Sequence, residues 1–179
     1  MLRPTNCVGR PTWRRNCCQT EPVAGSRLVV TVTESIFIAR PPEAVFDYTQ
    51  DYARRTEWDA GIEAAELVSE EPRAARVTIR RLGSATVRYQ LFQRPERTSA
   101  AFVDVDSIWI TGGGGSWQYE ATDGGTTWQQ TNTLELKRPW LTRFIKRSIE
   151  RSLRDSTRTS MATAKERLER GPSDRPDLD

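Results

Sequence analysis

Short runs in which apolar and polar residues alternate occupy most of the chain between residues 28 and 136. They are rich in Val, Ile, Thr and aromatic residues, which is typical of β-strands with one buried face. The pattern predicts strands at residues 28–38, 62–69, 75–82, 85–92, 99–105, 116–121 and 127–136. Because the connections between most of these runs are short, we expect the strands to pair antiparallel in one sheet.

The first strand is expected to end at Pro41 and Pro42, since a proline cannot donate a hydrogen bond to a neighbouring strand. Proline also suits the first turn of a helix, where Glu43 lies near the positive end of the helix dipole. Apolar residues then recur at helical spacing, which predicts two short helices at residues 42–50 and 51–58.

A long helix is predicted from Trp140 to about Arg170, ended by the Gly-Pro pair that follows. One broad stripe on it is bulky at the start and small towards the end: Leu141, Phe144, Ile145, Ile149, Leu153, Ser156, Ser160 and Ala164. The sheet has one face to bury, and this helix is the obvious cover. The prediction is therefore an α+β helix-grip fold, a curved antiparallel sheet of about seven strands wrapped around a long C-terminal helix. The bulky first half predicts a cavity beneath it.

Both ends of the chain lack such patterns. We expect residues 1–26 to be a disordered arm, residues 27–170 to be the folded domain and residues 171–179 to be a disordered tail. The three cysteines all lie within the first 18 residues and the chain has no histidine, so we expect no metal site and no disulfide framework. The lack of an apolar run of about 20 residues predicts no transmembrane segment, and a cytoplasmic location follows as the default.

The formal net charge is +3, but the basic residues are concentrated at residues 1–27 and 137–158. A solvated helix face is the simplest interpretation of the second group. Weak attraction to an anionic membrane surface is the alternative. We expect no nucleic-acid partner, because neither a known reader motif nor interleaved aromatic residues accompany the arginines.

Several local motifs resemble those of the START-like (SRPBCC) superfamily, and more closely its bacterial polyketide cyclase/dehydrase-like members. They are Ile38-x-x-Pro-Pro-x-x-Val-Phe-Asp47, Trp58-Asp59, Gln93-Arg-Pro-Glu-Arg97, Gly125-Thr126 and the closing amphipathic helix. The resemblance covers roughly residues 29–168. It implies a helix-grip fold with an internal cavity for an apolar or amphipathic small molecule. It carries over no catalytic residues, because each motif is structural.

The alternation of each strand indicates which side chains face inward. Glu34 shares the phase of the apolar residues of the first strand, and Gln130 and Asn132 share that of Trp128. We predict that the ligand contacts include Glu34, Trp58, Tyr89, Trp117, Tyr119, Trp128, Gln130, Asn132 and Phe144. The alternatives are that Glu34 and the two amides turn to water, and that Trp58 only packs the short helices onto the sheet.

Three functional hypotheses remain open. The first is binding or carriage of a hydrophobic or amphipathic small molecule, a lipid or a polyketide-like compound, without a cofactor. The second is a cyclase or dehydratase, with Tyr89 or Tyr119 as donor and an acid or base drawn from Glu34, Asp104, Asp106, Glu120 and Glu135. Nothing in the sequence selects among these, so the catalytic residues stay unknown. The third is a protein-interaction module with a collapsed cavity.

The glycine run Gly112–Gly115 lacks the Gly-Lys-Ser/Thr that ends a phosphate-binding loop and does not open a helix. A bend or wide bulge between two strands is the expected role of this run.

Overall fold

The computed structural model describes residues 28–137 and 144–170. Seven antiparallel strands form one sheet in the order β1-β7-β6-β5-β4-β3-β2. Their bounds are β1 (Leu28–Ile38), β2 (Ile62–Glu70), β3 (Arg73–Ile79), β4 (Gly83–Gln93), β5 (Arg97–Asp106), β6 (Ile110–Thr122) and β7 (Gly125–Leu136). Strands β2 to β7 follow one another across the sheet, and β1 pairs with β7 at the far edge.

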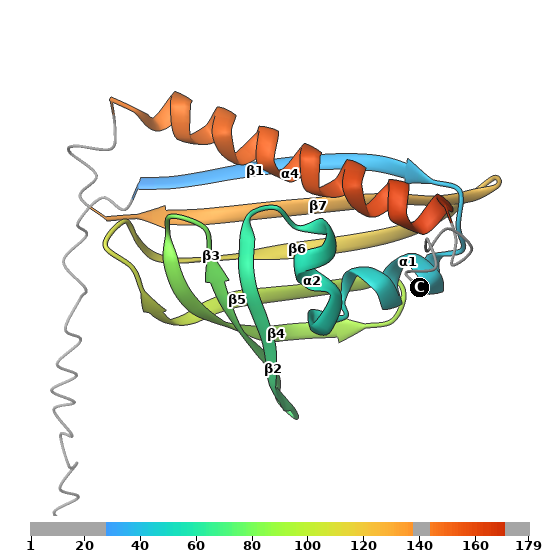
Figure 1. Cartoon of the computed structure of the whole chain (residues 1–179), viewed down its shortest axis with the longest axis horizontal. Helices are drawn as coiled ribbons and strands as arrows, with labels where there is room; N and C mark the ends of the chain where they lie inside the picture. Colours follow the sequence, from blue (N-terminus) through green and yellow to red (C-terminus); the bar gives the residue numbers. More distant parts are fainter. Residues whose placement is uncertain (1–27, 138–143, 171–179) are drawn as a thin grey trace, which may run out of the picture.

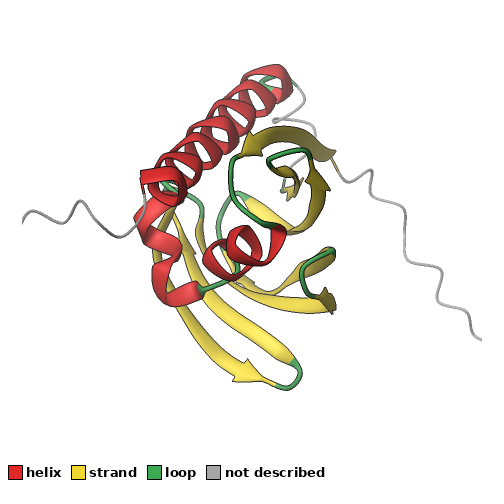
Figure 2. Ribbon diagram, turned by 90° about the vertical axis from the view of Figure 1, so that its right-hand side faces the viewer, coloured by secondary structure: helices red, strands yellow, loops and turns green. Residues whose placement is uncertain are grey.

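Between β1 and β2 lie helix α1 (Pro42–Thr49), the 3-10 turn η1 (Tyr52–Arg54) and the single-turn helix α2 (Arg55–Trp58). The long helix α4 (Lys146–Arg170) runs along β1 and β7 (Figure 1). In Figure 2 the sheet curves away beneath α4, and the short helices lie on its concave side. The predicted α+β helix-grip fold is therefore confirmed.

The transition from β1 to α1 follows from the two prolines. Pro41 is extended, with φ −61° and ψ 151°, and its carbonyl oxygen accepts the first helical hydrogen bonds from the amides of Ala44 and Val45. Pro42 opens the helix, where no amide hydrogen is needed. The second predicted helix is shorter than expected, because residues 52–54 form a 3-10 turn before α2.

The glycine run was predicted to form a bend or wide bulge between two strands, but it lies inside β6, so its predicted place is wrong and a bulge-like irregularity is found only at its start. The ladder between β6 and β7 has a register shift between Ile110 and Gly112, and the strand then continues through all four glycines. At Gly114 a Cβ atom would lie 2.3 Å from the carbonyl oxygen of Ala100 on β5. Glycine is thus required there because the two backbones approach too closely for any side chain.

The core consists of two clusters of buried side chains. The larger one joins the short helices, the middle of the sheet and the second half of α4, and includes Trp58, Trp128, Met161 and Ala164. The smaller one contains Val30, Ile110, Leu134 and Leu136. The small residues in the second half of α4 therefore allow this half to pack closely on the protein, as the sequence predicts.

The first half of α4 is less closely packed. Phe144 is predicted from its helical spacing to lie against the sheet, but its side chain is 79% exposed, so that prediction is wrong. The physical reason is that α4 begins only at Lys146, and Phe144 therefore does not share the buried stripe of the helix. The predicted helical residues 140–143, the predicted arm at 1–26 and the predicted tail at 171–179 lie outside the described residues. Within the described residues, no helix is long and apolar enough to cross a membrane.

Candidate ligand-binding cavity

A cavity of about 530 Å³ lies between the first half of α4 and the concave face of the sheet, where the sequence analysis expects it. Most of its wall is apolar and comes from Ile62, Val77, Ile79, Leu82, Val87, Phe102, Leu134, Leu136, Ile149 and Leu153. A volume of this size and an apolar wall with a few polar groups are typical of small-molecule sites.

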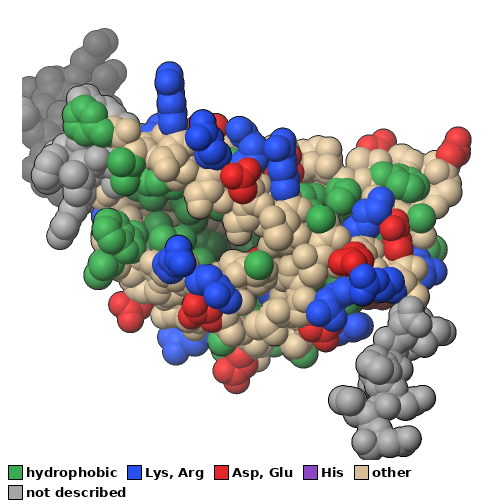
Figure 3. Space-filling model, turned by 45° about the horizontal axis from the view of Figure 1, so that its top comes forward, with side chains coloured by type: hydrophobic (Ala, Val, Ile, Leu, Met, Phe, Trp, Pro, Cys, Tyr) green, Lys and Arg blue, Asp and Glu red, His purple; other side chains and the backbone are tan. Residues whose placement is uncertain are grey.

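The exposed residues in the lining mark the mouth of the cavity. Arg80 and Arg81 come from the turn between β3 and β4, Trp109 from the connection between β5 and β6, and Ile145 from the turn just before α4. Trp109 and Ile145 are each 48% exposed. Figure 3 shows the hollow bordered by hydrophobic side chains and by Lys or Arg side chains. An apolar molecule can therefore reach the cavity past a rim that is itself partly apolar.

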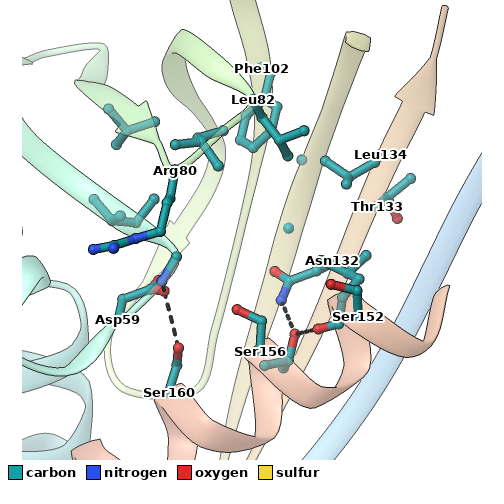
Figure 4. Close-up of a pocket in the computed structure, with 18 of the residues that line it drawn as sticks. Asp59, Arg80, Leu82, Phe102, Asn132, Thr133, Leu134, Ser152, Ser156 and Ser160 are labelled. Carbon is teal, nitrogen blue, oxygen red and sulfur yellow. Dashed lines mark hydrogen bonds between the residues drawn. The ribbon is translucent and has the colours of Figure 1, made fainter. Parts of the chain in front are cut away.

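Helix α4 contributes a row of serines to the wall: Ser148, Ser152, Ser156 and Ser160. Residues four apart lie on one face of a helix, so the four side chains line up along the cavity. Figure 4 shows Ser152, Ser156 and Ser160 on the side of α4 that faces the sheet. Their small size leaves room for a ligand, and their hydroxyl groups give the cavity one polar side. The four-residue repeat is visible in the sequence and could have identified the whole row.

A chain of hydrogen bonds connects the sheet to α4. Gln130 Nε2 donates to Asn132 Oδ1 at 3.1 Å, and Asn132 Nδ2 lies 2.9 Å from Thr157 Oγ1. The Thr157 hydroxyl in turn donates to the carbonyl oxygen of Leu153 at 2.8 Å. Gln130, Asn132 and Thr157 all line the cavity. Thr157 was not anticipated, because its contact with Asn132 spans 25 positions in the sequence.

A buried ion pair forms the inner end of the cavity. Arg55 Nη2 lies 2.9 Å from Asp59 Oδ2, and the two side chains are only 8% and 13% exposed. The other carboxylate oxygen of Asp59 accepts from Ser160 Oγ and from the Gly61 amide, both at 3.2 Å (Figure 4). The Arg55 guanidinium also lies 4.3 Å from the centre of the Trp58 ring, within the range of a cation–π contact.

Burial acts to lower the pKa of Arg55, but the charge of the Asp59 carboxylate and its hydrogen bond to the guanidinium act in the opposite direction, and the pKa lies above its usual value. Arg55 therefore stays charged. Asp59 is part of a sequence motif, but neither it nor Arg55 was predicted as a site residue, because a charged residue in a short helix is usually exposed.

Behind the inner end of the cavity, three tyrosines, a threonine and a glutamine form a buried hydrogen-bond network. The Tyr119 hydroxyl lies 2.7 Å from Thr49 Oγ1 and accepts from Gln50 Nε2 at 2.7 Å. Tyr89 donates to Gln50 Oε1 at 2.7 Å, and its oxygen lies 3.0 Å from that of Tyr52. Because the side-chain amide of Gln50 joins two of the phenols, the network fixes the short helical segment against β4 and β6.

All four tyrosines have raised pKa values. Burial raises the pKa of Tyr119 to about 12, and burial together with Glu57 raises that of Tyr48 to about 12. Burial also raises the pKa of Tyr52 and, with the nearby Tyr52, that of Tyr89. These phenols therefore stay protonated well above neutral pH and act as hydrogen-bonding groups only.

We expect the folded protein to form little tyrosinate at pH 10–11, whereas the urea-unfolded chain titrates near pH 10. The folded protein holds these protons more tightly than the unfolded chain does. Their contribution to the free energy of unfolding is therefore fully present below pH 10 and is lost as the pH rises towards 12. For Tyr119 alone, the rise of the pKa from 10.0 to about 12 corresponds to about 3 kcal/mol. Absorbance at 295 nm measures the tyrosinate, and Tyr119→Phe should reduce the loss of stability. Equal titration of the folded and unfolded protein would contradict this assignment.

The structure brings three of the predicted ligand contacts, Trp117, Gln130 and Asn132, to the cavity wall. Trp58, Tyr89, Tyr119 and Trp128 are buried in the larger core cluster and are not part of the cavity wall. Trp58 is 1% exposed and lies edge-on to Trp128, with ring centres 5.6 Å apart, so it packs the short helices onto the sheet. Phe144 does not line the cavity either.

Glu34 faces α4, as its strand phase predicts, but lies outside the cavity wall. Its two carboxylate oxygens pair with Arg154 at 3.1 Å and with Arg158 at 2.7 Å. This contact ties the edge strand β1 to α4 and uses two arginines of the basic helix face. The basic face of α4 is therefore not purely a solvated surface, because two of its arginines form ion pairs with β1.

No cluster of three or more acidic or cysteine side chains within residues 28–137 and 144–170 is arranged to hold a metal ion.

The fold and the cavity define a helix-grip domain with an internal pocket. The model of the family described as polyketide cyclase / dehydrase and lipid transport matches residues 29–169. The chain therefore belongs to this family within the START-like superfamily. No protein of curated function matches the chain in sequence.

Solved structures share the fold at low sequence identity. TTHA0849 from Thermus thermophilus is 18% identical with a TM-score of 0.68, over 80% of this chain and 99% of that one. The Zhui aromatase/cyclase from Streptomyces sp. R1128 is 13% identical with a TM-score of 0.67, over 80% and 95% of the two chains. A START superfamily protein from Mycobacterium smegmatis is 15% identical with a TM-score of 0.58, over 78% and 97%. At these identities the likeness shows the fold alone.

Proposed function

We propose that the protein binds or carries a hydrophobic or amphipathic small molecule, of the lipid or polyketide type, in the cavity beneath α4. The observation that carries this proposal is an open cavity of about 530 Å³ with apolar walls on the sheet and a row of serines on the helix. The partly apolar mouth supports entry of such a molecule. The same open volume argues against an interaction module with a filled interior.

The family and the aromatase/cyclase neighbour make a cyclase-type enzyme the second candidate. The cavity supports this candidate less well. None of the carboxylates considered for acid or base catalysis lines the cavity: Glu34, Asp104, Asp106, Glu120 and Glu135. Asp59 does line it, but its carboxylate already accepts from Arg55, Ser160 and the Gly61 amide. Within the described residues, a carboxylate with spare capacity for proton transfer is therefore missing from the wall.

Binding can be tested with N-phenyl-1-naphthylamine, an uncharged probe whose fluorescence rises in an apolar site. We expect the wild-type protein to bind it, and the variant Ser152→Trp to bind it about tenfold more weakly because the indole fills the cavity. Thr159→Trp is the matched control, since Thr159 is an exposed residue of the same helix and does not line the cavity. The control should bind like the wild type.

The melting temperature of each variant shows whether the fold is intact. A folded wild-type protein that fails to bind the probe would rule out the proposed function. Equal loss of binding in both variants would place the probe elsewhere on the protein.

A further inference from the structure

Among the residues that the structure describes, two buried polar atoms of the cavity wall have no hydrogen-bond partner: Trp117 Nε1 and Gln130 Oε1. Within the described residues, buried side-chain atoms without a partner also occur on Trp58, Arg73, Thr98 and Trp128, but none of these four residues lines the cavity. An unpaired buried donor or acceptor costs stability, and so it calls for a physical explanation. For atoms in the wall of a cavity, a hydrogen bond to a polar group of a bound ligand is such an explanation.

The two residues are direct neighbours. Trp117 on β6 and Gln130 on β7 are partners in the antiparallel ladder, and they are 4% and 3% exposed. Side chains opposite each other in such a pair have Cβ atoms about 5 Å apart and lie on the same face of the sheet, so both residues belong to one part of the cavity wall. The indole is held in place, because its six-membered ring covers Gly115 and stacks with Tyr89 at 6.4 Å.

The hydrogen-bond chain to α4 determines which atom Gln130 leaves unpaired. The Leu153 carbonyl can only accept, so the Thr157 hydroxyl must donate to it and can then accept from Asn132. Asn132 therefore turns its Nδ2 towards Thr157 and its Oδ1 towards Gln130. Because Asn132 Oδ1 can only accept, Gln130 must donate to it with Nε2, and its Oε1 is left as an acceptor without a partner. The helix backbone thus sets the polarity of the whole chain.

We propose that Gln130 Oε1 and Trp117 Nε1 form a subsite for one hydroxyl group, so the ligand is an apolar molecule that carries a phenolic or alcoholic hydroxyl. A hydroxyl donates one hydrogen bond and accepts others, and it therefore satisfies both atoms at once. A ketone or an ether can only accept, and it leaves Gln130 Oε1 unpaired. This inference rests on the proposed function, because it names the class of ligand for the same cavity.

Both atoms are covered by neighbouring protein atoms, so binding requires a small local adjustment. Because the indole is held in place, the Gln130 side chain is the group that moves. The terminal torsion of a glutamine side chain is broad and costs little to change. A modest rotation of the Gln130 amide, with its Nε2 still directed at Asn132, brings Oε1 within reach of a bound hydroxyl.

The test compares two competitors of similar shape, 1-naphthol and 1-methoxynaphthalene, in displacing N-phenyl-1-naphthylamine from the full chain. The naphthol donates and accepts, whereas the methyl ether only accepts. We expect the wild-type protein to prefer 1-naphthol by about five- to tenfold, which is the usual worth of one buried hydrogen bond. Failure of the probe itself to bind would overturn the proposed function. Equal displacement by the two competitors would overturn the hydroxyl subsite alone.

Two variants and a control locate the preference. Gln130→Met removes the acceptor, which only the naphthol uses, and should bind 1-naphthol about five- to tenfold more weakly and 1-methoxynaphthalene as before. Trp117→Phe removes the donor, which both competitors can use, and should weaken the binding of both. The control is Trp128→Phe, which also removes an unpaired indole donor but at a residue outside the cavity wall. This control should keep the wild-type preference. Loss of the preference in the control as well would assign it to general packing and overturn the proposal.

The indole N–H resonance of Trp117 gives an independent measurement on ¹⁵N-labelled protein, and Trp117→Phe assigns it. We expect this signal to move downfield when 1-naphthol binds. A signal that stays in place while 1-naphthol saturates the cavity would overturn the subsite, even if the protein binds the competitor tightly.

Discussion

Replacing Trp58 with alanine is expected to lower the free energy of unfolding by about 3–5 kcal/mol. The side chain is 1% exposed and joins α2 to the sheet through its edge-on contact with Trp128. Removing it also takes away the aromatic face beneath the Arg55 guanidinium. The cost is large because a ring of this size leaves a cavity that the surrounding side chains can only partly fill.

Urea unfolding followed by far-UV circular dichroism measures this change. Phe144→Ala is the control, because Phe144 is 79% exposed, and it should change the stability by about 0.5 kcal/mol or less. A cost for Phe144→Ala as large as that for Trp58→Ala would mean that the turn before α4 is packed differently in solution.

Asp59→Asn is expected to destabilise the protein by about 3–5 kcal/mol, although the two side chains have nearly the same shape. The change removes the negative charge opposite Arg55, whose guanidinium is buried and cannot give up its proton. The asparagine can still accept from Ser160 and the Gly61 amide. The loss therefore arises from an uncompensated buried charge rather than from lost packing.

The matched control is Asp47→Asn. Asp47 pairs with Arg94 on the surface, where both side chains are more than half exposed, and its loss should cost about 1 kcal/mol or less. A double variant, Arg55→Met with Asp59→Leu, removes both charges and should recover much of the stability that Asp59→Asn loses. Equal costs for Asp59→Asn and Asp47→Asn in urea unfolding would show that the inner ion pair is exposed to water.

The strands of the sheet could be predicted well because the alternation of apolar and polar residues lies within each strand itself. In β7 the alternation of Trp128, Gln130 and Asn132 indicates which side chains face α4, and two of these three line the cavity. The glycine run was harder, because its place in β6 depends on the close approach of the β5 backbone rather than on local propensity.

The remaining site residues depend on contacts between distant segments. Arg55 is buried only because the short helices fold over the inner end of the cavity, and Thr157 meets Asn132 only when α4 lies on β7. The phase of Glu34 was predicted correctly, yet nothing local to β1 indicates that two arginines of α4 pair with it. Patterns along the chain thus predict the faces of its elements, but not which faces meet.

The uneven packing of α4 affects which part of a ligand the protein can discriminate. Thr157, Ser160, Met161 and Ala164 anchor one part of the helix, whereas the first turns have no fully buried residue. The helix is about 22 Å long between residues 161 and 146. A tilt of about 5° around its anchored part therefore moves the N-terminal end of α4 by about 2 Å. Such a tilt changes the width of the mouth and hardly alters the inner end. We therefore expect the protein to accept ligands whose size differs in the part near Ile145. We expect it to discriminate more strictly between ligands that differ in the part near Gln130 and Asp59.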